Sequence, residues 1–292
     1  MPHVSRAYGW FTFANYTGLL AVSVLCVLPL VHVLAVSFSG AAAASANLVG
    51  FWPIEFTWDA YEKTVGNRNF VRSLGVSVIR TSAGTVLGML TVLLVAYPLS
   101  KENAAFKGRS LYVWLFLFTM LFQAGMVPHY ILIQRLGLLN SIWALILPSL
   151  VNVYNAILLL NFFRQVPKEL EEAAWIDGAG HFRTLVSVYL PVSMPAIATL
   201  GLFTMVGHWN AWFDGLLYMT RVENYPLATF LQTVIVQQDF SKLAARPEDL
   251  ENIAQRTIKS AQIFIGALPI LVVYPFLQRY FVKGIVLGAV KE

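Results

Sequence analysis

Long stretches without charged residues alternate with shorter polar segments along most of the chain. Because lipid offers no hydrogen-bond partner to a bare backbone, apolar runs of about 17–25 residues are expected to span a membrane as helices, whereas barrel strands would be short and alternating. The pattern therefore predicts an all-α membrane protein with six transmembrane helices. Six windows without Asp, Glu, Lys or Arg reach this length: 17–37, 81–99, 110–128, 141–163, 192–213 and 260–278.

Composition supports this class and narrows what the chain can do. Hydrophobic residues make up 58% of the 292 residues and charged residues 12%, against about 25% charged residues in soluble domains. The net charge of +5 is spread over the polar segments without a run of Lys and Arg, so nucleic-acid binding is not indicated. A single cysteine, Cys26, excludes an intrachain disulfide, and the five histidines are scattered, so no metal site is expected.

The polar segments between the windows are too short to hold a second domain. The first window is too long for the core of a signal peptide, and we interpret it as a retained helix. We divide the chain into an N-terminal helix with an outer loop at 1–71, a transmembrane domain at 72–281 and a C-terminal tail at 282–292.

The distribution of Lys and Arg leaves the orientation nearly balanced. If the N-terminus is cytoplasmic, the inside segments hold ten of these residues and the outside segments nine. A dense group at 101–109 favours this assignment, because positive charge is enriched in short cytoplasmic loops.

The segment 164–191 is the most polar stretch between two of the windows. Pro167 suits the first turn of a helix, and three glutamates follow where the helix dipole favours negative charge. Gly178 and Gly180 are typical of a helix end. We expect a short helix, a glycine turn and a second short helix at about 181–189.

The order of residues in this segment resembles a known motif. The letters EAAWIDGAG at 172–180, followed by LP at 190–191, are similar to the EAA motif in permease subunits of bacterial ABC importers. Stretches at 125–148, 206–219 and 278–292 resemble the sugar-importing branch of that family, in particular the putative lipoprotein and polysaccharide permeases, which are related to the smaller maltose permease subunit. The resemblance covers about 70–292 and implies the MetI-like transmembrane fold of type I importers.

The resemblance implies that 164–191 is a cytoplasmic coupling segment that docks in a cleft of an ATP-binding subunit. The protein is then expected in a bacterial inner membrane, with both termini on the cytoplasmic side. Glu172 is then expected to pair with a basic residue of the ATPase, the alanines to allow close helix contact, and Gly178 to form the turn. The coupling residues are Glu172, Ala173, Ala174, Asp177 and Gly178.

The resemblance also implies partners. A second homologous permease subunit, two ATP-binding subunits and an extracytoplasmic sugar-binding protein are expected, besides membrane lipid. The chain lacks a GxxxxGK[ST] phosphate loop, so we expect it to be non-catalytic and to bind no cofactor, with ATP and Mg²⁺ held by the partner subunits. The tail at 288–292 is expected to reach toward the ATPase, and 221–257 to be an outer loop that contacts the binding protein.

Polar residues inside the windows are candidates for a substrate pathway, because such residues usually face a cavity or a partner. Indole rings stack on sugars, while amides and imidazoles bind hydroxyl groups. Arg80 is expected either to steer an anionic sugar, such as an alginate fragment, or to extend outward to the membrane surface. The candidates for contact with substrate are His208, Trp209, Asn210, Trp212, Gln123 and Asn152.

Two other classes of membrane protein compete with an importer subunit. An ion-coupled secondary transporter usually carries Asp or Glu at membrane depth, and the charge-free windows argue against it. An intramembrane enzyme needs a nucleophile with its base or a metal pattern such as HExxH, and neither is present.

Overall fold

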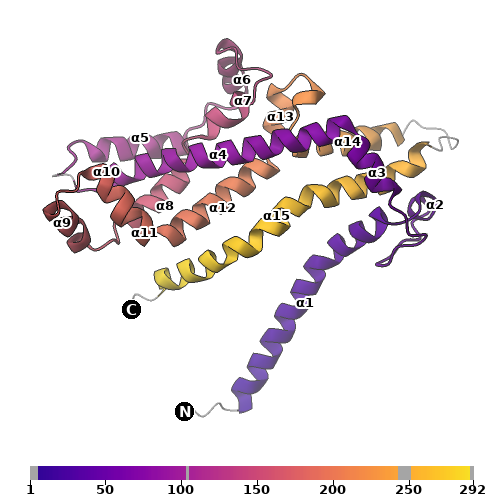
Figure 1. Cartoon of the computed structure of the whole chain (residues 1–292), viewed down its shortest axis with the longest axis horizontal. Helices are drawn as coiled ribbons and strands as arrows, with labels where there is room; N and C mark the ends of the chain where they lie inside the picture. The colour runs from indigo at the N-terminus through magenta and orange to yellow at the C-terminus, as the bar shows by residue number, and fades with distance from the viewer. Residues whose placement is uncertain (1–5, 103–104, 243–250, 290–292) are drawn as a thin grey trace. The chain divides into compact units, whose positions relative to one another are not determined.

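The computed structural model describes the backbone of residues 6–102, 105–242 and 251–289, and the side chains of residues 8–102, 105–234 and 255–276. All regular structure in these residues is helical (Figure 1), which confirms the all-α prediction. Three helical stretches are long and apolar enough to cross a membrane alone: Tyr8–Ser37, Arg68–Ser100 and Gln255–Phe276.

Three further candidate spans are bent pairs of helices. They are Arg109–Leu121 with Met126–Arg135 at 111°, Trp143–Ser149 with Val153–Phe163 at 45°, and His181–Val192 with Met194–Asn210 at 85°. If each pair is one span, the described residues hold six, and each of the six predicted windows falls on one of them.

The helices have the following bounds: α1 (Arg6–Ser37), α2 (Ala41–Ser45), α3 (Asp59–Gly66), α4 (Arg68–Ser100), α5 (Arg109–Leu121), α6 (Met126–Arg135), α7 (Trp143–Ile146), η1 (Leu147–Ser149), α8 (Val153–Phe163), α9 (Lys168–Ile176), α10 (His181–Thr184), the π-helical turn η2 (Leu185–Tyr189), α11 (Leu190–Val192), α12 (Met194–Asn210), α13 (Phe213–Tyr218), η3 (Val222–Asn224), α14 (Leu227–Lys242) and α15 (Glu251–Ala289).

The chain forms two compact units, and the first joins residues 1–71 to residues 233–268. In this unit the ring of Phe38 stacks on Tyr61 at 4.7 Å between centroids and meets Trp58 edge-on at 4.9 Å. The guanidinium of Arg256 donates a hydrogen bond to the backbone oxygen of Ala44 at 2.8 Å. The ring contacts hold the segment that follows α1 together, and the hydrogen bond joins it to the first part of α15.

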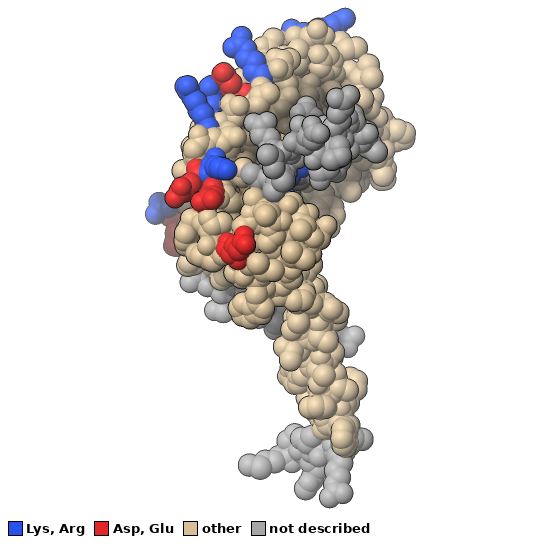
Figure 2. Space-filling model, turned by 90° about the vertical axis from the view of Figure 1, so that its right-hand side faces the viewer, with Lys and Arg blue, Asp and Glu red and all other residues tan. Residues whose placement is uncertain are grey.

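Helix α1 presents an apolar surface. No charged residue lies between Tyr8 and Ser37, and large side chains such as Trp10 are exposed. In Figure 2, α1 is the tan stretch that leads to the grey N-terminal residues, and its visible face carries neither blue nor red atoms. Such a surface suits the hydrocarbon layer of a membrane.

The second unit comprises residues 72–232 and 269–292. Its main core packs α4 against α8 and against the α10–α12 region, because small and branched side chains let these helices approach closely. The buried members of this core are Met89, Val92, Ala96, Tyr97, Leu99, Ala156, Leu159, Leu160, Phe163, Val166, Leu185, Tyr189, Ala196 and Leu200. A smaller cluster joins α6, α7 and α13 around Ile133, Leu145 and Tyr218.

The third predicted span is shorter as a helix than its window. Helix α5 ends at Leu121, and the chain turns by 111° before α6 begins. Gly125 allows this turn, because its φ of 84° lies in a region that residues with a side chain rarely adopt. The apolar run at 110–128 gave no sign of the break, since hydropathy does not register a change of direction.

Two expectations for the polar segments need correction. The second short helix, expected at 181–189, continues through the π-helical turn η2 and through Pro191 to Val192. The expected loop at 221–257 is largely helical, because η3, α14 and the start of α15 lie in it, and Leu227 and Phe230 are buried. Residues 243–250 and 290–292 of the expected loop and tail lie outside the described residues, and the reach of the tail stays a prediction.

Candidate functional site

Helix α9 has well-defined ends. It follows Pro167, and Glu169 and Glu171 lie in its first turn, where the exposed N–H groups and the helix dipole favour carboxylates. After the helix, Gly178 adopts a φ of 78°, a conformation that glycine reaches without steric cost. The turn expected at Gly178 is therefore formed.

Glu171 attaches α9 to the end of α4. The ammonium of Lys101, the residue after α4, donates to Oε1 of Glu171 at 2.5 Å and to the hydroxyl of Tyr189 at 2.9 Å. That hydroxyl in turn donates to Oε2 of Glu171 at 2.6 Å. Burial lowers the pKa of Lys101 below its usual 10.5, although Glu171 opposes this shift. Charge-assisted hydrogen bonds of this kind are strong away from water.

The sequence did not predict this role of Glu171, because its pattern does not distinguish the glutamates of α9 from one another. Nothing local separates Glu171 from Glu172, because the partner, Lys101, lies 70 residues earlier in the chain. The arrangement of α4 against α9 would have to be known first.

The predicted coupling residues lie mostly on the surface. Glu172, Ala173, Asp177 and Gly178 are exposed and Ala174 is half-buried. Ile176, on the same helix, is 87% exposed. Trp175 and Phe182 are exposed as well, and large apolar side chains that gather on a surface mark a site of contact with another protein.

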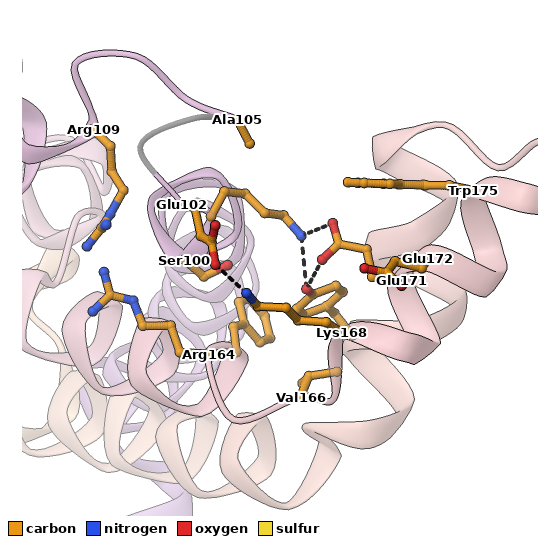
Figure 3. Close-up of a pocket in the computed structure, with 13 residues that line it drawn as sticks. Ser100, Glu102, Ala105, Arg109, Arg164, Val166, Lys168, Glu171, Glu172 and Trp175 are labelled. Carbon is orange, nitrogen blue, oxygen red and sulfur yellow. Dashed lines mark hydrogen bonds and ion pairs between the residues drawn. The ribbon is translucent and has the colours of Figure 1, made fainter.

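A cavity of about 540 Å³ lies beside α9 (Figure 3). In it, Lys168 donates to Glu102, and this ion pair lowers the pKa of Glu102 and raises that of Lys168. The cavity is lined by Ser100, Lys101, Glu102, Ala105, Arg109, Phe163, Arg164, Val166, Lys168, Glu171, Glu172, Trp175 and Tyr189.

A second cavity, of about 470 Å³, lies among the predicted spans. Two of the candidates for substrate contact, His208 and Asn152, line it. Other polar residues that were not among these candidates line it as well: Ser149, Asn155, Thr204 and Asp214. The amide of Asn155 donates to the hydroxyl of Thr204 at 3.1 Å, which joins α8 to α12.

Arg80 is buried and also lines the second cavity, so the expectation that it extends to the membrane surface is wrong. Its guanidinium donates to both carboxylate oxygens of Asp214 and, at 3.0 Å, to the backbone oxygen of Ala211. The charge of Arg80 is thereby balanced inside the protein. The pairing ties α4 to the start of α13 and to the break before it.

The other four candidates do not line the second cavity. Trp209 is buried and lines a smaller, mainly apolar cavity of about 200 Å³ with residues of α4 and α15. Asn210, Trp212 and Gln123 are exposed. Their contact with substrate stays a prediction.

Comparison with known proteins gives consistent matches. The family model described as "Binding-protein-dependent transport system inner membrane component" matches residues 84–287. Protein LplC of Bacillus subtilis (strain 168) is 40% identical over 291 residues, which cover 99% of this chain and 97% of that protein. The polygalacturonan/rhamnogalacturonan transport system permease protein YtcP of the same strain is 38% identical over 286 residues, 96% of this chain and 98% of that protein.

Solved structures with the same fold are also known. A chain from the crystal structure of a bacterial ABC transporter involved in the import of the acidic polysaccharide alginate has a TM-score of 0.84 and 28% identity, over 96% of this chain and 100% of that chain. A chain from a bacterial alginate ABC transporter in complex with an alginate pentasaccharide-bound periplasmic protein has a TM-score of 0.53 and 16% identity, over 92% of each chain. The second likeness concerns the fold alone.

Proposed function

Because the chain belongs to the family of binding-protein-dependent transport system inner membrane components, we propose that it is the permease subunit of an ATP-driven importer that translocates an oligosaccharide delivered by a soluble binding protein. The alternative of an ion-coupled secondary transporter is not favoured by this family membership. The carboxylate of Asp214, which lines the second cavity, is already paired with Arg80.

Coupling to ATP hydrolysis is assigned to α9. The observation that carries this proposal is the contrast between two neighbouring carboxylates. Glu171 fastens the helix to α4 through Lys101, while Glu172 is exposed and has no ion-pair partner among the described residues. A force that a partner exerts on Glu172 would therefore be transmitted through α9 to the membrane-spanning helix α4, as coupling requires.

The remaining parts of the complex follow from the same proposal. ATP and Mg²⁺ are held by two ATP-binding subunits that dock on α9, and a second permease subunit completes the pathway. Helix α9 then lies on the cytoplasmic side of the membrane, and both termini lie on the same side.

The second cavity supports a sugar as the cargo. Amide, imidazole and hydroxyl groups from Asn152, His208 and Thr204 lie beside the aromatic rings of Tyr154 and Phe203, which is the mixture of groups that sugars bind. Two of the similar proteins are named for acidic polysaccharides, so acidic oligosaccharides are the first cargo to test.

The test is ATP hydrolysis by the full complex in nanodiscs with its binding protein. Oligogalacturonates, alginate oligosaccharides and neutral malto-oligosaccharides are compared for the wild type, Glu172→Ala and Glu169→Ala. Glu169 is an exposed glutamate of the same helix that does not line the first cavity, so its removal controls for the change of charge.

We expect one class of sugar to stimulate hydrolysis in the wild type and in Glu169→Ala, and Glu172→Ala to lose most of this stimulation while the complex stays assembled. If no sugar stimulates the wild type, the carbohydrate assignment is wrong. Equal stimulation of all three proteins would remove Glu172 from coupling. Loss of uptake on depolarisation at constant ATP would favour the secondary transporter.

A further inference from the structure

Two of the four cations that line the cavity beside α9 have no carboxylate partner in the described part of the chain. The two lysines of this cavity pair with glutamates. Arg109 and Arg164 form no ion pair and no side-chain hydrogen bond with any residue that the structure describes. An unpaired arginine is ordinary on a surface but unusual beside a second one in a shared cavity.

The two guanidinium groups point toward one another at one side of the cavity (Figure 3). Nε of Arg109 is buried and has no hydrogen-bond partner among the residues that the structure describes, which is rare for a buried donor. Arg109 is also the first residue of α5, and the first turn of this helix holds no acidic residue. The helix dipole disfavours a cation at that end. An anion between the two arginines would relieve each of these costs.

We propose that Arg109 and Arg164 bind the phosphate group of an anionic membrane lipid. A guanidinium presents two parallel N–H groups that match two oxygens of a phosphate, and two converging guanidiniums can hold one phosphate from two sides. The free N–H of Arg109 then gains an acceptor.

The position of the arginines favours a lipid over a soluble phosphate. Arg109 begins α5 and Arg164 follows the last residue of α8, and both helices are limbs of candidate spans. Lipid phosphates lie at the level where such apolar helices end. Helix α5 has no buried residue, and Leu111 and Leu115 are exposed along it, so acyl chains can lie against α5 below the bound phosphate.

The experiment measures lipid retention by the purified complex with native mass spectrometry. Palmitoyl-oleoyl phosphatidylglycerol is titrated against zwitterionic palmitoyl-oleoyl phosphatidylcholine, with and without inorganic phosphate as competitor. The double variant Arg109→Gln/Arg164→Gln is compared with Lys107→Gln/Arg183→Gln, which removes the same charge from two exposed residues outside the cavity.

We expect the wild type and the Lys107/Arg183 control to retain phosphatidylglycerol selectively, and the Arg109/Arg164 variant to bind it at least about tenfold more weakly, since hydrogen bonds to charged groups are lost. Arg109→Lys/Arg164→Lys keeps the charge but not the planar fork, so intermediate retention is expected. If inorganic phosphate displaces the lipid, the two compete for the same site, which supports recognition of the lipid through its phosphate group.

Equal retention by wild type and the Arg109/Arg164 variant overturns the proposal, since the arginines would then act only as general interfacial charge. Crosslinking of Arg109 or Arg164 to an acidic segment of a partner subunit, without selective lipid retention, also overturns it. Size-exclusion chromatography of each variant establishes that the complex is assembled before lipid is measured. The outcome is independent of cargo and of the role of Glu172.

Discussion

Glu171 and Glu172 are neighbours on helix α9, yet Glu171 is 8% exposed and held by Lys101 and Tyr189, whereas Glu172 is exposed without an ion-pair partner among the described residues. One carboxylate thus belongs to the interior of the permease and the other is available to a partner. If both were exposed, α9 could rotate against the bundle when pushed. The contacts of Glu171 with Lys101 and Tyr189 make α9 move together with α4 and the rest of the bundle.

Removal of Lys101 should destabilise the protein more than removal of an exposed cation of the same cavity. Lys101→Met leaves the carboxylate of Glu171 buried with only the Tyr189 hydroxyl, and breaking a buried pair in this way costs about 3–5 kcal/mol. Lys168→Gln breaks the pair with Glu102, which is well exposed, and should leave the melting temperature nearly unchanged. Thermal unfolding in detergent, followed by tryptophan fluorescence, gives both values.

The double variant Lys101→Met/Glu171→Leu separates the pair from simple packing. With both charges gone, no unpaired carboxylate is buried, so most of the stability lost in Lys101→Met should return. A double variant as unstable as the single one would mean that Lys101 acts through its aliphatic chain and not through its charge.

Lys101 should contribute to the stability of the protein in a way that rises with pH in the alkaline range. Its pKa in the folded chain is lowered from 10.5 by burial, so between these two values the unfolded chain binds more protons, and the free energy of unfolding increases with pH. The stabilisation is complete above 10.5 and is lost as the pH falls through the lowered pKa. The slope of melting temperature against pH should be more positive for wild type than for Lys101→Met, and equal slopes would contradict the assignment.

The sequence was sufficient for the class of fold and for the local structure of α9. Long apolar windows determine membrane helices because the backbone has no other way to satisfy its hydrogen bonds in lipid, and Pro167 and Gly178 mark the ends of a short helix by their own backbone preferences. Both signals are local. The bend at 122–125 was not predicted, because an apolar run has the same hydropathy whether it is straight or turned.

Pairings between distant residues were beyond sequence reasoning. Arg80 and Asp214 are 134 positions apart, and a lone arginine near a helix end is equally compatible with a position at the membrane surface. His208 and Asn152 were selected as polar residues in apolar windows and do line a cavity. The same criterion selected Trp209, which lies in a mainly apolar cavity, because residue type alone does not tell which side of a helix faces the interior.

Arg80→Met should destabilise the protein by about 2–4 kcal/mol, since the carboxylate of Asp214 loses its ion-pair partner. The side chain of Asp214 is 29% exposed, so partial hydration keeps the cost below that of a fully buried pair. Arg80→Met/Asp214→Leu should recover part of the loss, and Arg72→Met is the control, because its pair with Glu223 is exposed. Equal melting temperatures for Arg80→Met and Arg72→Met would show that the Arg80 pair has no special weight.

Gly84→Ala should disturb the second cavity, whereas Gly88→Ala should not. A Cβ at Gly84 would lie 2.6 Å from Nε2 of His208, so the imidazole must move, while a Cβ at Gly88 would have its nearest neighbour at 3.7 Å. Overpacking of this kind costs about 1–3 kcal/mol, and alanine in a helix without a clash gains up to about 1 kcal/mol over glycine. We expect lower stability and slower sugar uptake for Gly84→Ala only. Equal uptake by the two variants would mean that His208 does not contribute to sugar translocation.

Gly178→Ala should loosen the end of α9 and weaken coupling, because the φ of 78° at this position costs a residue with a Cβ about 1–2 kcal/mol. Gly180→Ala is the matched control: Gly180 has a φ of −78° and an added Cβ would meet nothing within 4 Å. Hydrogen exchange should become faster in α9 for Gly178→Ala, and the sugar-stimulated ATP hydrolysis of the complex should fall, while Gly180→Ala stays close to wild type. Faster exchange in α9 with full stimulation would mean that docking on the ATPase restores the turn, and the rigidity of α9 would then come from the assembled complex and not from Gly178.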